Sequence, residues 1–111
     1  MKAEERDRRL LEYIRSSIDH VERYYRPNWD SFELEEMAAD AILRRLETLS
    51  DAAAHLSERL RARHQEIAWP RIVGFRNVLA HGYLSIDPER IDDVLRHDLP
   101  PLKEVVNDEL S

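Results

Sequence analysis

Hydrophobic residues recur every three or four positions along most of the chain, which is the spacing of one face of an α-helix. Between Arg6 and Tyr25 the intervals are 3, 4, 3 and 4 residues, through Leu11, Ile14, Ile18, Val21 and Tyr25. The stretch RPNWDS then ends the pattern, because the residue before a proline disfavours helical geometry. Asp30 or Ser31 can cap a following helix. The sequence therefore predicts a first helix up to Tyr25 and a second that begins near Ser31.

A second apolar seam predicts that this second helix is long. Its members are three or four residues apart: Leu34, Ala38, Ile42, Leu46, Leu49, Ala53, Leu56 and Leu60. An unbroken helix from Ser31 to His64 would be roughly 50 Å long, more than a globule of 111 residues covers by itself. We therefore expect either a break near Ser57 or a partner that buries part of the seam.

Prolines and a glycine predict three further helices. The boundaries are Trp69 with Pro70 and Gly82 for the third, Pro88 for the fourth, and Pro100 or Pro101 for the fifth. The apolar positions of the last two are Ile91, Val94, Leu95, Leu102, Val105, Val106 and Leu110. Strand formers are scarce and the connections are short, so the expected fold class is all-α, a bundle of four to five helices with antiparallel neighbours. We expect one domain over residues 1–111.

The composition limits the environment and the partners. The chain has no cysteine, so it forms neither disulfides nor thiolate metal sites, and we expect a cytoplasmic protein. The N-terminus is densely charged and no apolar run approaches ~18 residues, which predicts no secretory or membrane segment. Seventeen basic and 23 acidic residues give 17 − 23 = −6, which argues against coating nucleic acid through bulk charge. Any site for a polyanion must therefore be local.

The stretch GFRNVLAHGY carries an unusual polar set for an apolar helix. At about 100° per residue, Asn77 and His81 fall within roughly 40° of each other, with Arg76 beside them and Tyr83 just beyond Gly82. A histidine near a helix C-terminus gains affinity for a proton from the macrodipole. Metal-free RNA cleavage needs a base, an acid and a cation at the phosphate, which Arg and His can supply. The alternative is that His81 caps a helix and Arg76 forms a surface ion pair.

The run from Arg76 to Tyr83 matches R-N-x-x-x-H-x-Y, and with it the sequence resembles the HepT toxins of the HEPN superfamily. The likeness continues in MAADAILRRLETLSDAAAHLSERLRARHQEIAW and in DPERIDDVLRHDLPPLKEVV, so it covers nearly the whole chain. It implies an all-α HEPN fold, a homodimer that brings two motifs to one cleft, and a metal-independent endoribonuclease that acts on RNA, with tRNA among the candidate substrates. Arg76 would bind and polarise the scissile phosphate, His81 would move the proton, and Asn77 would orient the site.

The resemblance also implies regulation and a partner. The chain would be the toxin of a type II-like toxin-antitoxin pair, and a minimal nucleotidyltransferase antitoxin would transfer AMP from ATP to Tyr83. That AMP would add bulk and negative charge and would repel RNA. No other cofactor is implied. Many relatives have Pro-Trp where this chain has Trp69 and Pro70, which touches the start of the helix and not the chemistry.

Other residues offer weaker signals. Arg44 and Arg45, or Arg71, are candidates to extend a basic surface, the alternative being that each is only solvated. Four histidines lack the spacing of metal ligands, so no metal site is predicted and each is interpreted as a surface or capping residue: His20, His55, His64 and His97. Trp29 and Trp69 are interpreted as hydrophobic staples beside helix starts.

A second function, from a different class, stays open. The chain could be a non-catalytic helical module that binds a nucleotide or presents a substrate to a nucleotidyltransferase. The intact set of Arg76, His81 and Tyr83 favours the ribonuclease.

Overall fold

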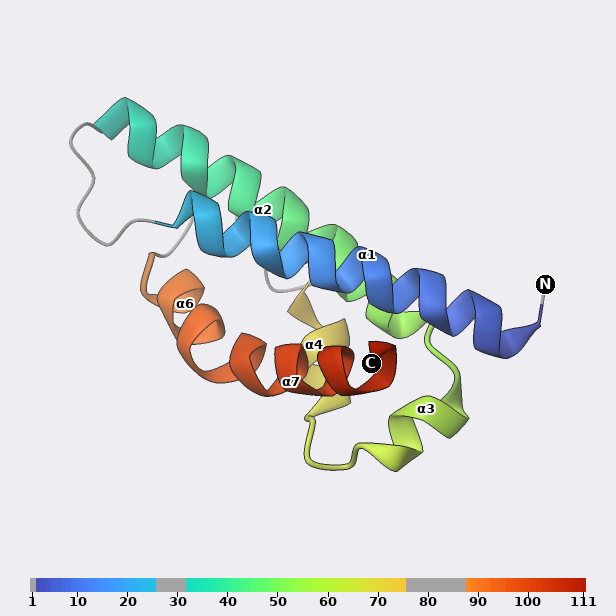
Figure 1. The fold of residues 1–111 in the computed structure, drawn as a ribbon. Helices are drawn as coiled ribbons and strands as arrows, with labels where there is room; N and C mark the ends of the chain where they lie inside the picture. Colours follow the sequence, from blue (N-terminus) through green and yellow to red (C-terminus); the bar gives the residue numbers. More distant parts are fainter. Residues whose placement is uncertain (1, 26–31, 76–87) are drawn as a thin grey trace.

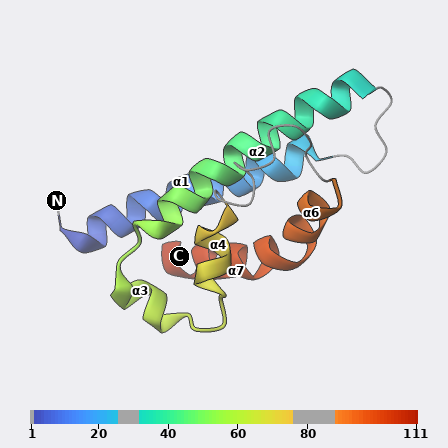
Figure 2. The ribbon, with the colours of Figure 1, turned by 180° about the vertical axis from the view of Figure 1, so that it is seen from behind.

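The computed structural model describes residues 2–25, 32–75 and 88–111. Its elements are α1 (Ala3–Tyr24), α2 (Phe32–Ala54), α3 (Glu58–Arg63), α4 (Trp69–Val73), α6 (Pro88–Asp93), a π-helix η1 (Val94–Asp98) and α7 (Leu99–Leu110) (Figure 1). Helices α1 and α2 lie side by side and antiparallel, and α7 packs across α1 (Figures 1 and 2). The described ranges contain helices and no strand, so the predicted all-α fold class is confirmed.

The first helix forms as the pattern predicted. Leu11, Ile14, Ile18 and Val21 are at most 3% exposed, and the other faces of α1 carry mainly charged side chains. Tyr25, at the end of the stripe, is half-buried and follows the last helical residue. Burial of one aliphatic face is what stabilises a helix of this kind in water.

The second predicted helix is interrupted near Ser57, which was one of the two expected alternatives. Helix α2 ends at Ala54, and α3 begins after Ser57, whose hydroxyl oxygen accepts from the Leu60 N–H at 3.2 Å. The Asp7 carboxylate on α1 accepts from the Ser57 N–H at 2.9 Å and from its hydroxyl at 2.6 Å. The break is therefore a capped corner tied to α1. Seven seam residues with described side chains are buried or half-buried: Ala38, Ile42, Leu46, Leu49, Ala53, Leu56 and Leu60.

The C-terminal part begins its helices where the prolines predicted but joins them by a π-helix that the sequence did not predict. Pro100 and Pro101 have no N–H, so the carbonyls of Arg96 and His97 receive no ordinary α-helical bond from them. The Leu99 N–H instead reaches five residues back, to the Val94 carbonyl. Helix α7 then buries one face in the core: Leu99, Leu102, Val105, Val106 and Leu110.

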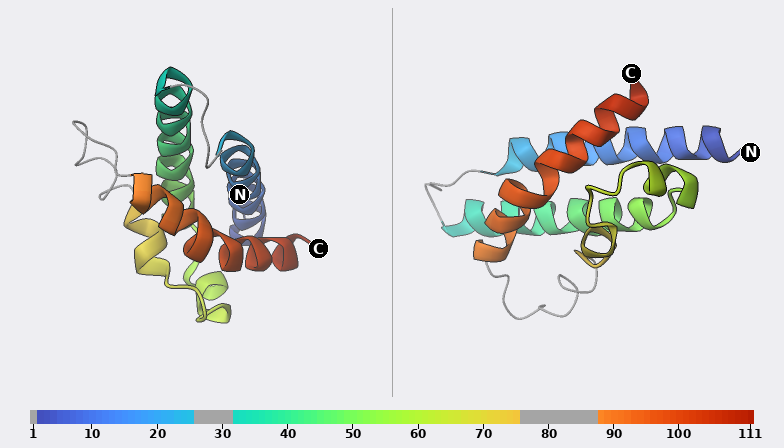
Figure 3. Two further views of the ribbon diagram at one scale, coloured as in Figure 1. Left: turned by 90° about the vertical axis from the view of Figure 1, so that its left-hand side faces the viewer. Right: turned by 90° about the horizontal axis from the view of Figure 1, so that it is seen from below.

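The two long helices are covered from below by separate elements. Viewed along the pair, α7 lies beneath α1 and the short α4 lies beneath α2 (Figure 3). We call α1, α2 and α7 the scaffold, because they supply most of the buried aliphatic side chains. None of the helices in the described ranges has an apolar stretch long enough to cross a bilayer.

Candidate functional site

The predicted site residues lie outside the described part of the chain. These are Arg76, Asn77, His81 and Tyr83, and with them the predicted helix end at Gly82. We call residues 76–87 the motif segment. The structure describes the residues on either side of it, from α4 to Phe75 and from Pro88 into η1, and we call α4, α6 and η1 the frame of the motif segment.

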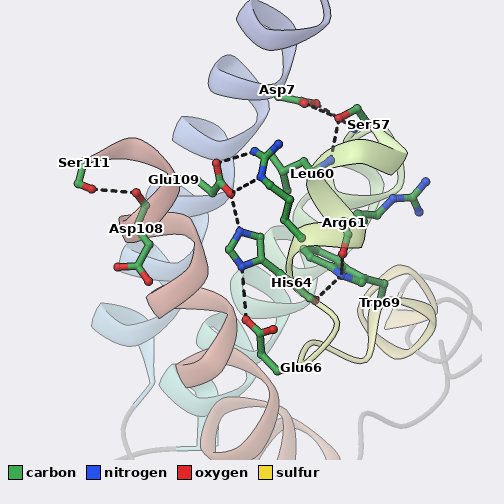
Figure 4. A network of polar contacts seen from close by, with 11 residues as sticks. Asp7, Ser57, Leu60, Arg61, His64, Glu66, Trp69, Asp108, Glu109 and Ser111 are labelled. Atoms are coloured by element: carbon green, nitrogen blue, oxygen red, sulfur yellow. Dashed lines mark hydrogen bonds and ion pairs between the residues drawn. The ribbon is translucent and has the colours of Figure 1, made fainter.

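The start of α4 is held by its tryptophan. Trp69 is 8% exposed, and its indole Nε1–H points at two carbonyl oxygens, those of Arg61 at 3.1 Å and His64 at 3.0 Å (Figure 4). Pro70 occupies the first turn, where a missing N–H costs no helical bond. Trp69 is thus buried at a helix start, and its described contacts are hydrogen bonds to the end of α3, so its role as a staple stays a prediction; Trp29 lies outside the described residues.

The end of α4 is held by a serine from α2. Ser50 is 1% exposed, and its hydroxyl lies 2.9 Å from the Ile72 carbonyl oxygen and 2.7 Å from that of Val73. Those carbonyls would accept from residues 76 and 77 if α4 ran on without a break. Sequence reasoning missed Ser50; its signal was a small polar residue beside Leu49 on the buried seam.

The predicted continuous helix from Trp69 to Gly82 is interrupted in its described part. Helix α4 ends at Val73, and Gly74 forms a turn whose N–H bonds to the Pro70 carbonyl at 2.9 Å. A Cβ on Gly74 would lie 3.0 Å from that carbonyl oxygen, closer than side chains normally come. Glycine also has a low helix propensity, so the helix is interrupted at the residue that stabilises it least.

Arg71 joins α4 to the elements that follow the motif segment. Its Nε lies 2.8 and 2.9 Å from the two carboxylate oxygens of Asp98, and its Nη2 lies 3.2 Å from Asp93 Oδ2. The hydrogen bond that Arg71 donates to Asp98 is the main cause that raises the pKa of Arg71 above its usual value. Two carboxylates therefore already neutralise this arginine. The prediction that Arg71 extends a basic surface is not supported. For Arg44 and Arg45 it stays a prediction, since Arg44 is exposed and lies 3.7 Å from Glu47 on its own helix.

Helix α6 is also tied to the end of α1. The Tyr25 hydroxyl donates to the Asp92 carboxylate, and Arg96 Nε lies 2.8 Å from the other oxygen of that group. The hydrogen bond from Tyr25, followed by that from Arg96, lowers the pKa of Asp92, and the same bond to Asp92 raises the pKa of Tyr25. Both neighbours of the motif segment are thus held by polar side-chain contacts.

Three of the remaining histidines behave as predicted, as surface or capping residues. His20 and His55 place Nδ1 at 2.7 and 2.8 Å from the carbonyl oxygens of Ser16 and Asp51, four residues earlier in each case. His97 is exposed and lies 3.4 Å from Asp93. In the described part of the chain, no group of three or more His, Asp or Glu side chains is arranged to hold a metal ion.

His64 is more than a surface residue. Its side chain is 17% exposed, with Nε2 at 2.5 Å from Glu109 Oε2 and Nδ1 at 3.4 Å from Glu66 (Figure 4). Arg63 approaches the same Glu109 carboxylate at 2.8 Å, and its hydrogen bond is the main cause that lowers the pKa of Glu109. This cluster attaches α3 to the C-terminus of α7.

Comparisons with known proteins identify relatives along nearly the whole chain. A "Probable ribonuclease HepT" of Thermococcus cleftensis is 27% identical over 104 residues, which are 93% of each chain. A "Putative RNase" of Methanocaldococcus jannaschii is 27% identical over 97 residues, 87% of this chain and 89% of its own. A longer protein of the same archaeon, named "Gamma-glutamylcyclotransferase and putative RNase", is 29% identical over 97 residues, and the match spans 86% of this chain but 44% of that relative. No solved structure gives a significant match.

The family comparison covers the described scaffold and the motif segment together. The family described as "Ribonuclease HepT-like" matches residues 14–109, which begin within α1 and end in α7. The predicted motif from Arg76 to Tyr83 lies inside this range. By this match over most of its length, the chain belongs to the HepT-like ribonuclease family.

Proposed function

We propose that this chain is the ribonuclease toxin of a toxin-antitoxin pair and that it cleaves RNA internally without a metal ion. One observation carries the proposal: the HepT-like match spans residues 14–109 and so includes the complete set of Arg76, Asn77, His81 and Tyr83. The frame supports it, because α4 and α6 are each held by specific polar contacts next to that segment. The named ribonuclease relatives are similar over the same range.

The chemistry proposed for the motif is a transesterification. A base removes the proton from the ribose 2′-hydroxyl, the 2′-oxygen forms a bond to phosphorus, and the bond from phosphorus to the 5′-oxygen breaks as that oxygen takes up a proton. His81 of one protomer is the base, and the corresponding histidine of a second copy in a homodimer is the acid. Arg76 stabilises the extra negative charge on the phosphorane, and Asn77 orients the phosphate.

The proposed local site also answers the charge problem. The chain carries −6, and Arg71 already lies between Asp93 and Asp98, so attraction of RNA by general basicity is excluded as the main source of affinity. Two Arg76 side chains in one cleft supply cations where the phosphate reacts and nowhere else. Because such a site contacts few phosphates, its affinity for RNA is modest and falls only slightly as the salt concentration rises.

Regulation is proposed at Tyr83. In the active site of a nucleotidyltransferase antitoxin, the Tyr83 hydroxyl loses its proton and its oxygen forms a bond to the α-phosphorus of ATP. The bond from that phosphorus to the oxygen bridging to the β-phosphate breaks, and pyrophosphate leaves. The attached AMP places a phosphodiester charge beside Arg76 and blocks the approach of RNA. Because RNA and ATP are both needed, the proposed location is the cytoplasm.

Cleavage of total RNA and tRNA in EDTA tests the proposal. Wild type is compared with His81→Ala and Arg76→Ala, after the oligomeric state and the mass of Tyr83 have been checked for each. Cutting by wild type that falls at least about 100-fold in both variants supports the nuclease. Tyr83→Phe is the matched control: it keeps cleavage but resists modification by the antitoxin. If AMP-free wild type of the same oligomeric state cuts no RNA, the non-catalytic module becomes the better account.

A further inference from the structure

One polar cluster in the described part of the chain joins the two sides of the motif segment. The side chain of Trp69 on α4 reaches α3, and Ser50 of α2 reaches the carbonyls of α4. The side chain of Arg71 on α4 instead reaches η1 and α6. Arg71 stands five residues before residue 76, and Asp93 stands six residues after residue 87. A contact at this place fixes the position of the end of α4 relative to the start of α6.

The π-helix explains how two acidic residues reach one arginine. In an ordinary α-helix, residues five apart point about 140° away from each other. Asp93 and Asp98 are five residues apart, and the wider turn of η1 brings both carboxylates to the same side of the helix. Arg71 donates hydrogen bonds to both of them there. Asp98 is the better held of the two, since its side chain is 12% exposed against 54% for Asp93, which also faces His97.

Within the described ranges, the contact of the Asp98 side chain is with Arg71 and not with the start of α7. Asp98 stands at the N-cap position of α7, yet its side chain makes no capping hydrogen bond. The Asp98 carboxylate is largely buried and bonds Arg71 instead of the N–H groups at the start of α7. We take the bond to Arg71, a charge-assisted hydrogen bond, as the reason for its position. The five residues of α4 are too few to be a stable helix by themselves, so the contacts of its side chains decide where it lies.

We propose that Arg71, Asp93 and Asp98 form a clamp that positions the motif segment for catalysis, and that Arg71 does not contact RNA. The inference rests on the proposed function. Arg71 is a positioning residue: it acts on Arg76 and His81 through the backbone of α4 and α6. The rival account takes the half-exposed Arg71 as a phosphate contact that the two carboxylates merely shield.

The two accounts predict opposite effects for removal of Asp98. If Arg71 were a phosphate contact, Asp98→Ala would free a cation and lower KM, while Arg71→Ala would raise it. If the clamp positions the motif segment, both variants lose the same link. Misplaced catalytic groups slow the chemical step, so kcat falls in both and KM changes little.

The test is single-turnover and steady-state cleavage of one RNA by wild type, Arg71→Ala, Asp98→Ala and the double variant. We expect kcat to fall about tenfold or more in each single variant, KM to stay within about twofold, and the double variant to be no slower than the worse single one. Arg8→Ala is the matched control, because Arg8 also pairs with a carboxylate, Glu12, but within α1, and its kcat stays at the wild-type value. A lower KM in Asp98→Ala, or a wild-type kcat in both single variants, overturns the clamp.

A second readout separates failure of the clamp from failure of the proposed function. Amide hydrogen exchange is followed in peptides from residues 69–75 and 88–98, with α1 as the internal reference. If wild type cuts no RNA but both variants exchange about twofold faster in these peptides and not in α1, the proposed nuclease is wrong and the clamp stands as a structural contact. Unchanged exchange in both variants overturns the clamp whatever the activity.

Discussion

The scaffold and the frame of the motif segment are built by different interactions. The scaffold helices have 22, 23 and 12 residues and meet through aliphatic side chains such as Leu46 and Leu102, which are fully buried. In the frame, α4 has five residues and α6 has six, and a serine, an indole N–H and an arginine hold α4 in place. Nonspecific burial can stabilise a fold, but only directional contacts can orient a short segment. Stability and activity should therefore respond to different substitutions.

The largest effect on stability is expected in the scaffold. Leu46 is 0% exposed in the middle of α2, and Leu46→Ala removes its packing and leaves a cavity. We expect the free energy of unfolding to fall by about 3 kcal/mol, measured by urea denaturation, while kcat per folded molecule stays near the wild-type value. A loss of less than about 1 kcal/mol would show that packing of this part of α2 contributes little to the stability of the core.

The next effect is expected where scaffold and frame meet. Ser50→Ala leaves the carbonyls of Ile72 and Val73 without the serine hydroxyl that bonds them. An unpaired buried polar group costs about 1–3 kcal/mol, so we expect a loss of about 2 kcal/mol in the same denaturation experiment. This variant should also lower kcat, since the end of α4 loses its attachment to α2. A variant that loses the stability but keeps full kcat would contradict the separate role of the frame.

The same contrast explains what the sequence could predict about the fold. The periodicity predicted α1, the seam of α2 and the buried face of α7. These helices are stabilised by burial of aliphatic side chains, and the same burial requires an aliphatic residue every three or four positions. It did not predict the turn at Gly74, because the bonds of Ser50 to Ile72 and Val73 join positions more than twenty residues apart. Nor did it predict η1, where two prolines lack the N–H groups that an α-helix needs and the Leu99 N–H bonds five residues back, as in a π-helix.

The site shows a similar division. Arg76, Asn77, His81 and Tyr83 were recognised by their resemblance to a family, since a lone Arg and His at that spacing is also found in ordinary surface helices. Their roles stay predictions, because these residues lie outside the described part of the chain. The supporting set of Ser50, Asp93 and Asp98 could not be selected from the sequence, because each is one of many polar residues until its contact is known.

A smaller effect, dependent on pH, is expected at the junction of α3 and α7. Arg63 and His64 both face Glu109, and the hydrogen bond from Arg63 is the largest cause of its lowered pKa. A carboxylate whose pKa is lower in the folded state contributes stability above its unfolded pKa, near 4.5, and loses it as the pH falls through the folded value. Glu109→Gln should therefore cost about 1 kcal/mol at pH 7 and nothing at a pH below the folded value.

Denaturation midpoints at several pH values between 7 and about 2.5 check this. The control is Glu104→Gln, which changes an exposed residue on the same helix and should leave both the stability and its pH dependence as in wild type. Parallel curves for Glu109→Gln and wild type over the whole range would mean that the cluster does not contribute to folding.

The smallest effect should have the opposite sign, and it isolates what a buried hydroxyl contributes in each region. Ser17 in α1 is 0% exposed, like Ser50, but its hydroxyl has no hydrogen-bond partner in the described structure. Ser17→Ala removes an unpaired polar group and improves the helix propensity, so the free energy of unfolding should rise by about 0.5–1 kcal/mol. The two serine-to-alanine changes delete the same atom at the same burial, and they differ only in whether that atom holds another segment. If both lower stability equally, a partner for Ser17 exists in solution, and the scaffold relies on a directional contact as the frame does.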